Sequence, residues 1–246
     1  MLNRQSLQRI GQILLVLSLV ICMAQFSYAA PDGPSIEYIS NETASPRSAS
    51  IINTTGGSIT TMNLNVTAQN LKWKAFVGNV SGRLMLADAT NYSVFDWAVT
   101  SVVGEVYASR SSTTVSWNNI GCSNITHITN EERALNHTDN PNDNISTTFA
   151  TKNHDSFFIG TTEITENGCY SIHTNVNNQT QDTDFEEVIL YDGTGISDGD
   201  IVFATILEQD TLGFDNGRYD FQMIVPEVAL ASWTSSTAYY FYAELT

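Results

Sequence analysis

The sequence predicts an all-β protein: a β-sandwich or jelly-roll-like single domain with one short helix, preceded by a secretory signal peptide and a strand-bearing tail. Short runs of alternating apolar and polar residues recur along the chain, turn-forming residues separate them, and one segment alone has a helix signature. We therefore divide the 246 residues into a signal peptide over 1–29, an extended tail or linker over 30–58 and a β-sandwich domain over 59–246.

A secretory signal peptide is indicated at the start of the chain. Arg4 and Arg9 precede an apolar run over 10–24, and Ser27 and Ala29 supply the small residues that a signal peptidase requires. The apolar run is shorter than the roughly 20 residues that cross a membrane. We expect cleavage after Ala29 and no membrane span in the mature chain, with retention of the segment as an anchor as the alternative.

The charge balance disfavours a nucleic-acid partner. The chain has 26 acidic and 10 basic residues, and two of the basic residues, Arg4 and Arg9, belong to the signal segment. The remaining eight against 26 leave a mature net charge of −18. Because nucleic-acid binding depends on neutralising phosphates with Lys and Arg, we expect no such partner.

Export from the cell determines how we interpret the cysteines and the asparagines. Cys122 and Cys169 are the two cysteines left after cleavage, and we expect them to form a disulfide. Nine asparagines stand in the acceptor pattern Asn-x-Ser/Thr and are candidate glycosylation sites. They are Asn41, Asn53, Asn65, Asn79, Asn91, Asn124, Asn136, Asn144 and Asn178.

Three extended segments are expected before residue 83. The tail carries one short strand in "SIEYI", where Ile36 and Tyr38 share a side. "ITTMNLNVTA", residues 59–68, alternates apolar and polar residues and predicts a strand with one solvated face. In the following strand, "LKWKAFV", the same alternation places Trp73 in the core and directs Lys72 and Lys74 outward, as suits an edge strand.

The remaining sequence predicts a series of short strands, with one helix between two groups of them. Thr129 with Glu132 three residues later resembles a capping box and predicts a helix over about 130–137. A turn at Asp215–Gly217 is expected between two strands. Further strands are expected at 83–87, 93–99, 104–109, 113–117, 156–160, 169–177, 185–191, 200–208, 219–225 and 237–245.

The last strand has aromatic residues on both faces. In "TAYYFYAEL" the side chains of Tyr239 and Phe241 share one face, and those of Tyr240 and Tyr242 share the other. A strand of this kind is usually covered on both sides. The cover is either part of the same chain or a neighbouring molecule. Ile36, Tyr38, Tyr240 and Tyr242 are accordingly the candidate assembly-strand residues.

The sequence contains no recognisable catalytic motif. The serine of "GNVSG" is one place too late for a nucleophile elbow, and the four histidines lack metal-site spacing. The best ligand candidate is the loop "YDGTGISDGD", where Asp192, Asp198 and Asp200 could supply oxygen ligands to Ca²⁺. The alternative is a simple turn between two strands, and no other cofactor is expected.

Several stretches resemble a known group of proteins. "LKWKAFVGNVSG", "GEVYASR", "FEEVILYDGT", "YDFQMIVPE" and "YYFYAELT" are similar, in the same order, to stretches of a poorly characterised group of exported archaeal surface proteins. The matches run from Trp73 to Leu245 and include the pattern W-x-x-[FY]-x-G-N-V-[ST]-G. The resemblance implies one domain on the archaeal cell envelope and supplies no catalytic residues.

These observations predict a secreted, N-glycosylated structural surface protein, not an enzyme. We expect it to self-assemble into a filament or coat through donor-strand-type contacts, since the tail carries a strand and the final strand is aromatic on both faces. The alternative is a monomeric adhesin module that recognises surface glycans through exposed aromatic residues. A secreted hydrolase is the third possibility, because a catalytic carboxylate pair is brought together in space and not in sequence.

Overall fold

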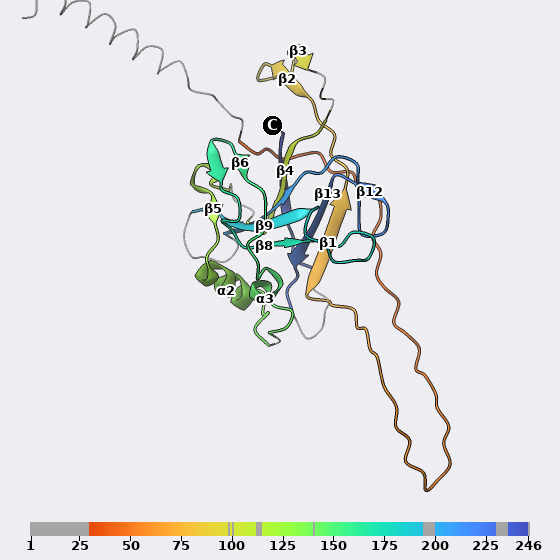
Figure 1. Ribbon diagram of the computed structural model, residues 1–246. Coiled ribbons are helices and arrows are strands. Elements are labelled where there is room, and N and C mark those ends of the chain that lie inside the picture. Colours follow the sequence, from red (N-terminus) through yellow and green to blue (C-terminus); the bar gives the residue numbers. More distant parts are fainter. Residues whose placement is uncertain are drawn as a thin grey trace, which may run out of the picture.

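The structure is a computed structural model that describes residues 30–97, 99, 101–111, 115–139, 141–193, 200–229 and 236–245. The predicted signal peptide over 1–29 lies outside these residues. Within them the protein is mainly β, with antiparallel sheets and two short α-helices, which confirms the predicted class (Figure 1). No helix in this part of the chain is both long and apolar enough to span a membrane.

The centre of the fold is a six-stranded antiparallel sheet. Its order is β14 (Tyr240–Leu245), β4 (Gly104–Ser109), β10 (Ile201–Ile206) and β9 (Glu186–Tyr191). Two short strands, β5 (Gly121–Cys122) and β8 (Ser171–His173), then both pair with β9. Strands β4, β9 and β10 are almost completely buried, as is typical of strands covered on both faces, although β4 carries Glu105 and β9 carries Glu186 and Glu187.

One face of this sheet is covered by a strand pair and two helices. Strand β1 (Trp73–Gly78) pairs with β13 (Phe221–Pro226), and the backbone amide of Ile224 in β13 donates to the buried Glu187 carboxylate of β9 at 2.8 Å. Helices α2 (Ile125–Ala134) and α3 (Ile145–Thr148) complete the layer. Phe203, Ile189, Phe149 and Met223 are among the buried side chains of this core.

The opposite face of the sheet has its own apolar cluster. The hairpin of β6 (Phe157–Ile159) and β7 (Thr162–Ile164) contributes to it, together with a 3₁₀-helix over Trp117–Asn119. The Cys122–Cys169 disulfide lies at this cluster, with its Cα atoms 4.9 Å apart. The predicted disulfide is therefore confirmed.

Two further hairpins lie outside the central sheet. The pair β11 (Thr211–Leu212) and β12 (Arg218–Tyr219) flanks the predicted turn at Asp215–Gly217. The pair β2 (Leu84–Ala87) and β3 (Ser93–Trp97) projects from the end of the domain where β14 finishes (Figure 1).

Two predictions in the middle of the chain are wrong. Helix α2 begins after Asn124, whose side chain accepts from the amides of Thr126 and His127, and His127 completes the capping box. Thr129 lies inside the helix, where its hydroxyl donates to the Ile125 carbonyl, so it caps nothing. Of the strand expected at 113–117, the described residues 115–117 form a turn into the 3₁₀-helix, and residues 113–114 lie outside the description.

Candidate functional site

The segment before β1 forms a long projecting loop. Residues 43–69, which we call the projecting loop, extend far from the domain and turn at Thr55–Ser58, where Gly57 has a φ of 81° (Figure 1). The strands expected at 36–39 and 59–68 are absent, although both segments are extended. No neighbouring strand pairs with them among the described residues, and every residue of both segments is exposed, so which side chains share a side remains a prediction.

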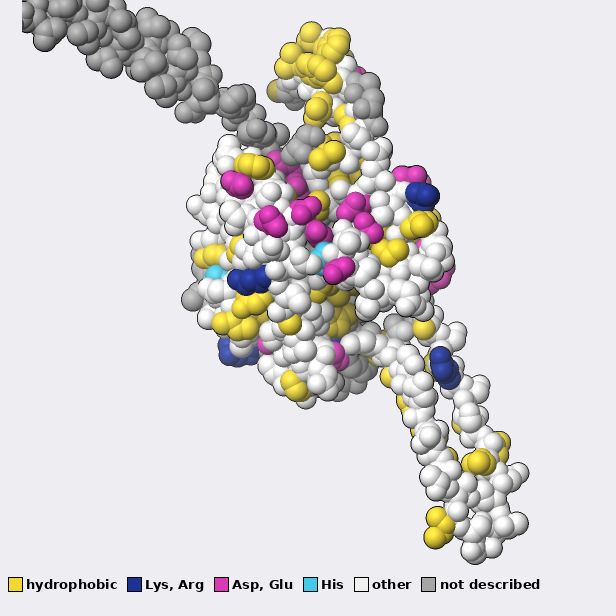
Figure 2. Space-filling view, in the orientation of Figure 1, with side chains coloured by type: hydrophobic (Ala, Val, Ile, Leu, Met, Phe, Trp, Pro, Cys, Tyr) yellow, Lys and Arg dark blue, Asp and Glu magenta, His cyan; other side chains and the backbone are white. Residues whose placement is uncertain are grey.

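Apolar side chains of this region face solvent. Of 24 exposed large hydrophobic residues in the described part of the chain, ten lie between Ile36 and Leu71 and seven between Leu84 and Trp97. Tyr38 is 74 % exposed and Leu64 is 80 % exposed. Figure 2 shows the same two concentrations, at the projecting hairpin and along the loop. Large exposed apolar patches usually mark interaction surfaces.

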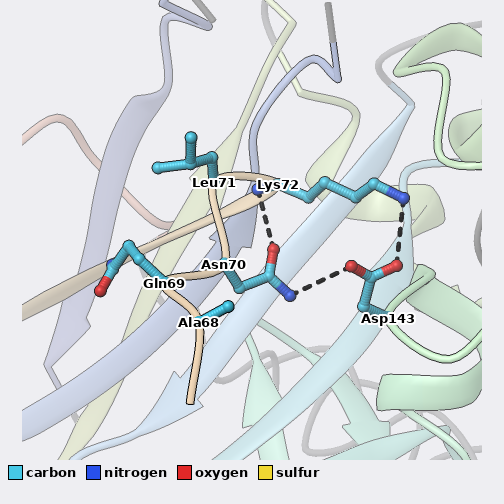
Figure 3. Close-up of a pocket in the computed structure, with 6 residues that line it drawn as sticks. All are labelled: Ala68, Gln69, Asn70, Leu71, Lys72 and Asp143. Atoms are coloured by element: carbon cyan, nitrogen blue, oxygen red, sulfur yellow. Dashed lines mark hydrogen bonds and ion pairs between the residues drawn. The ribbon is translucent and has the colours of Figure 1, made fainter. Parts of the chain in front are cut away.

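The chain is held to the domain on both sides of this exposed region. On the N-terminal side, Asp32 forms a β-bridge with Ala243 of β14, with backbone N–O distances of 3.1 and 2.9 Å. On the C-terminal side, Lys72 contacts Asp139 at 2.8 Å. Lys72 also contacts Asp143 at 3.0 Å, and Asn70 donates to Asp143 at 3.2 Å (Figure 3). The tail is therefore not a free end.

The structure corrects the predicted direction of the lysines in β1. Lys72 is only 6 % exposed, and Lys74 is half-buried and contacts Glu227 at 2.9 Å. Burial alone would lower the pKa of Lys72, but its bonds to Asp139 and Asp143 raise that pKa above the ordinary value. Long Lys stems can lie along apolar surface while their ammonium groups reach carboxylates, which an alternation rule does not foresee.

Trp73 packs against the core as expected. The side chains of the residues that follow it face the opposite way from the prediction. The Trp73 indole N–H donates to the Asp143 carbonyl at 2.9 Å, and the ring contacts His137 and Phe149. Phe76 then points inward and contacts Phe241. Val77, expected in the core, is exposed.

The four candidate assembly-strand residues are not brought together. Ile36 and Tyr38 are exposed and pair with no strand, and Asp32 is the tail residue that reaches β14. Tyr242 packs within its own molecule against Trp117, with ring centroids 5.2 Å apart, while Tyr240 is partly exposed. On its outer edge β14 has a backbone partner only at Ala243 among the residues described, so the rest of this edge remains open to another strand.

The acceptor asparagines and the acidic loop remain predictions with defined positions. Eight of the nine acceptor asparagines are exposed, and Asn144 is half-buried at the N-cap of α3. In the candidate calcium loop, the Asp192 side chain is buried and its amide donates to the Asp200 carbonyl at 3.1 Å. Asp198 lies outside the described residues. Within those residues, no group of three or more His, Cys, Asp or Glu could hold a metal ion.

A buried carboxylate pair lies between β4 and β14. Glu105 and Glu244 are directly opposite each other in the strand pair, and the Tyr107 hydroxyl lies 3.3 and 3.4 Å from their oxygens. The Gly160 amide donates to Glu244 at 2.9 Å. Burial first, and then the nearby charge of Glu244, raise the pKa of Glu105 to about 8. The pair is 4 % and 5 % exposed, so a sugar substrate has no access to it as it stands.

This pair predicts that stability falls as the pH rises. Folded Glu105 holds its proton up to about pH 8, whereas the unfolded carboxyl loses it above its ordinary value of 4.5. The contribution of Glu105 to the free energy of unfolding is therefore complete below pH 4.5 and is lost as the pH rises from 4.5 to 8. Relative to the unchanged protein, we expect Glu105→Gln to gain about 3 kcal/mol of stability between pH 5 and pH 8, since each unit of the raised pKa corresponds to about 1.4 kcal/mol. Urea unfolding at both pH values measures the difference.

Glu163→Gln is the matched control, since Glu163 lies exposed on β7. It should change stability equally little at both pH values. If Glu105→Gln behaves like this control, Glu105 is ionised in the folded protein and the assigned shift is wrong.

The signal that the sequence interpretation missed is the hairpin β2–β3. Leu84, Leu86, Phe95 and Trp97 were counted as ordinary strand residues, but all four are exposed. Their apolar character is visible in the sequence, but the absence of a covering layer over them is not. In comparisons with protein-family models, curated proteins and solved structures, no match to this chain was found.

Proposed function

We propose that this protein is a secreted, N-glycosylated structural surface protein that self-assembles into a filament or coat through donor-strand-type contacts. The observation that carries the proposal is an extended, alternating apolar segment that projects from the domain and pairs with no strand among the described residues. Burying apolar surface is the main favourable term in protein association, and an extended segment can add main-chain hydrogen bonds at a sheet edge.

Other features support the same proposal. The open edge of β14 offers a place for an incoming strand, as does the free edge of β1, which pairs only with β13 among the described residues. The signal-peptide pattern and the exposed acceptor asparagines favour an extracellular surface, and the resemblance to exported archaeal proteins favours an archaeal envelope. The packing of β1–β13 across the six-stranded sheet favours a sandwich-like fold.

The alternative, a monomeric glycan-binding adhesin, is favoured by one observation. Phe95 and Trp97 are exposed on the projecting hairpin, with ring centroids 5.0 Å apart. Aromatic faces of this kind can also stack on sugars. A sharp monomer that binds a sugar array, and loses binding in Trp97→Ala, would favour the adhesin.

Deletion of the exposed segment tests the proposal. We expect the chain from Ala30 onward to form long ordered polymers by negative-stain microscopy and light scattering. We expect a chain beginning at Asn70 to remain monomeric, because it lacks the tail and the projecting loop but keeps the Lys72 contacts. Formation of the Cys122–Cys169 disulfide and a cooperative unfolding transition control for folding of the shortened chain. A monomeric chain from Ala30 at every protein and salt concentration would refute self-assembly.

A further inference from the structure

The hairpin β2–β3 exposes most of its apolar side chains to solvent. The pairing register places Leu84 opposite Trp97 and Leu86 opposite Phe95, so the four side chains share one face. We call Leu84, Leu86, Phe95 and Trp97 the hairpin face; each of the four is about half exposed. The other face carries the exposed Met85 beside Asp96, whose carboxylate contacts Arg83 at 3.1 Å and Ser93 at 2.5 Å.

A hairpin of this composition requires a covering partner. An isolated two-stranded hairpin is marginally stable in water and normally gains a third strand or packs against another layer. Within the described residues β2 and β3 pair only with each other. The hairpin face is therefore exposed to solvent and available to a binding partner.

The second arm of the projecting loop has the matching pattern. From Met62 to Val66 the side chains of Met62, Leu64 and Val66 alternate with Asn63 and Asn65, and the three apolar residues are exposed. We call Met62, Leu64 and Val66 the arm face. At ~3.3 Å per residue the arm and a five-residue strand have the same length.

The two faces cannot meet within one molecule. The hairpin projects from the end of the domain where β14 finishes, whereas the loop projects from the opposite end (Figures 1 and 2). The arm leads directly into β1, which the Lys72 contacts and its pairing with β13 fix to the domain. A second copy of this chain can supply an arm face to the hairpin, or a hairpin face to the arm.

We propose that the arm face of one molecule packs on the hairpin face of the next molecule. This inference rests on the proposed function and identifies the two surfaces through which the molecules join. Because two different surfaces of the chain are joined, the contact is head-to-tail and leaves one free arm and one free hairpin after every addition. Such heterologous contacts produce open filaments unless the rotation closes a ring. Asn65 lies on the opposite side of the arm and Asn91 in the hairpin turn, so glycans on either leave both faces free.

Two single variants and their mixture test this contact. We expect Leu64→Ser, on the arm, and Trp97→Ser, on the hairpin, each to abolish polymers, measured by light scattering at about 1 M NaCl, where the Debye length of about 3 Å screens repulsion between acidic copies. An equimolar mixture should form a 1:1 heterodimer and no longer species, because only one intact arm and one intact hairpin face can meet. Both residues are exposed, so the thermal transition of each variant should be unchanged.

Matched controls lie on the opposite sides of the same elements. Asn63→Ser on the arm and Met85→Ser on the hairpin should polymerise like the unchanged chain. A chain from Gly57 onward, which lacks the tail but keeps the arm, should also polymerise. Failure of this shortened chain alone would instead assign the donor role to Ile36 and Tyr38 of the tail.

The outcomes separate this inference from the proposed function. If the unchanged chain polymerises and both variants still do, another surface mediates assembly and the arm–hairpin contact is wrong while the function stands. If the unchanged chain forms closed dimers that Trp97→Ser abolishes and Leu64→Ser does not, two hairpin faces pair with each other and the inference is wrong. If the unchanged chain is monomeric, the proposed function itself fails.

Discussion

Trp73→Ala is expected to lower the free energy of unfolding by about 3–5 kcal/mol. The substitution removes an indole that contacts Phe149 and His137, both of which are fully buried. It also leaves the Asp143 carbonyl without the 2.9 Å hydrogen bond from the indole N–H. Because Trp73 connects β1 to the loop that carries α3, its loss opens one end of the core. Urea unfolding followed by circular dichroism measures the change.

Trp97→Ala is the matched control, since it removes the same side chain from the exposed hairpin face. Surface substitutions of this kind usually change stability by no more than about 0.5 kcal/mol. Equal losses for the two tryptophans would show that the hairpin is part of the folded core. No loss for Trp73→Ala would show that Trp73 belongs to a binding surface.

Removal of the disulfide is the second large effect that we expect. The bond joins β5 to the residues just before β8 and closes a loop with a sequence separation of 47. On the chain-entropy model a loop of this length stabilises by roughly 4 kcal/mol. Replacing both Cys122 and Cys169 by serine should therefore lower the free energy of unfolding by about that amount, measured in urea without reductant.

The unchanged protein in reductant provides the comparison for the serine variant. The two should unfold at similar urea concentrations, and reductant should not change the variant. Mass spectrometry of unreduced peptides identifies the bond independently. Two free thiols in freshly purified protein would contradict the pairing.

The sequence predicted best where a strand is buried on both faces. Strands β4, β9 and β10 are short segments that each contain β-branched and aromatic side chains, a composition that favours a buried strand. Strand β14 followed the same logic, since Phe241 packs on one face of the sheet and Tyr242 on the other. Its aromatic residues are therefore covered mainly by its own chain.

Prediction failed where a pattern needs a partner that periodicity cannot specify. Met62, Leu64 and Val66 alternate with polar residues as regularly as any strand in the chain, yet no strand in the described part of the chain pairs with them. Alternation determines which side chains share a face, but not whether another strand is present. In β1, the carboxylates that attract Lys72 and Lys74 come from residues about 70 and 153 positions away, which no local rule could indicate.

The central claim is that copies of this chain join arm to hairpin, and intermolecular disulfide formation tests it most directly. Leu64→Cys and Leu86→Cys in one chain place a thiol on each face, while the native cysteines are already bonded to each other. After mild oxidation we expect a ladder of covalent multimers on a denaturing gel, and chains with either substitution alone should form no more than dimers. Monomers and dimers alone from the doubly substituted chain would contradict the head-to-tail contact.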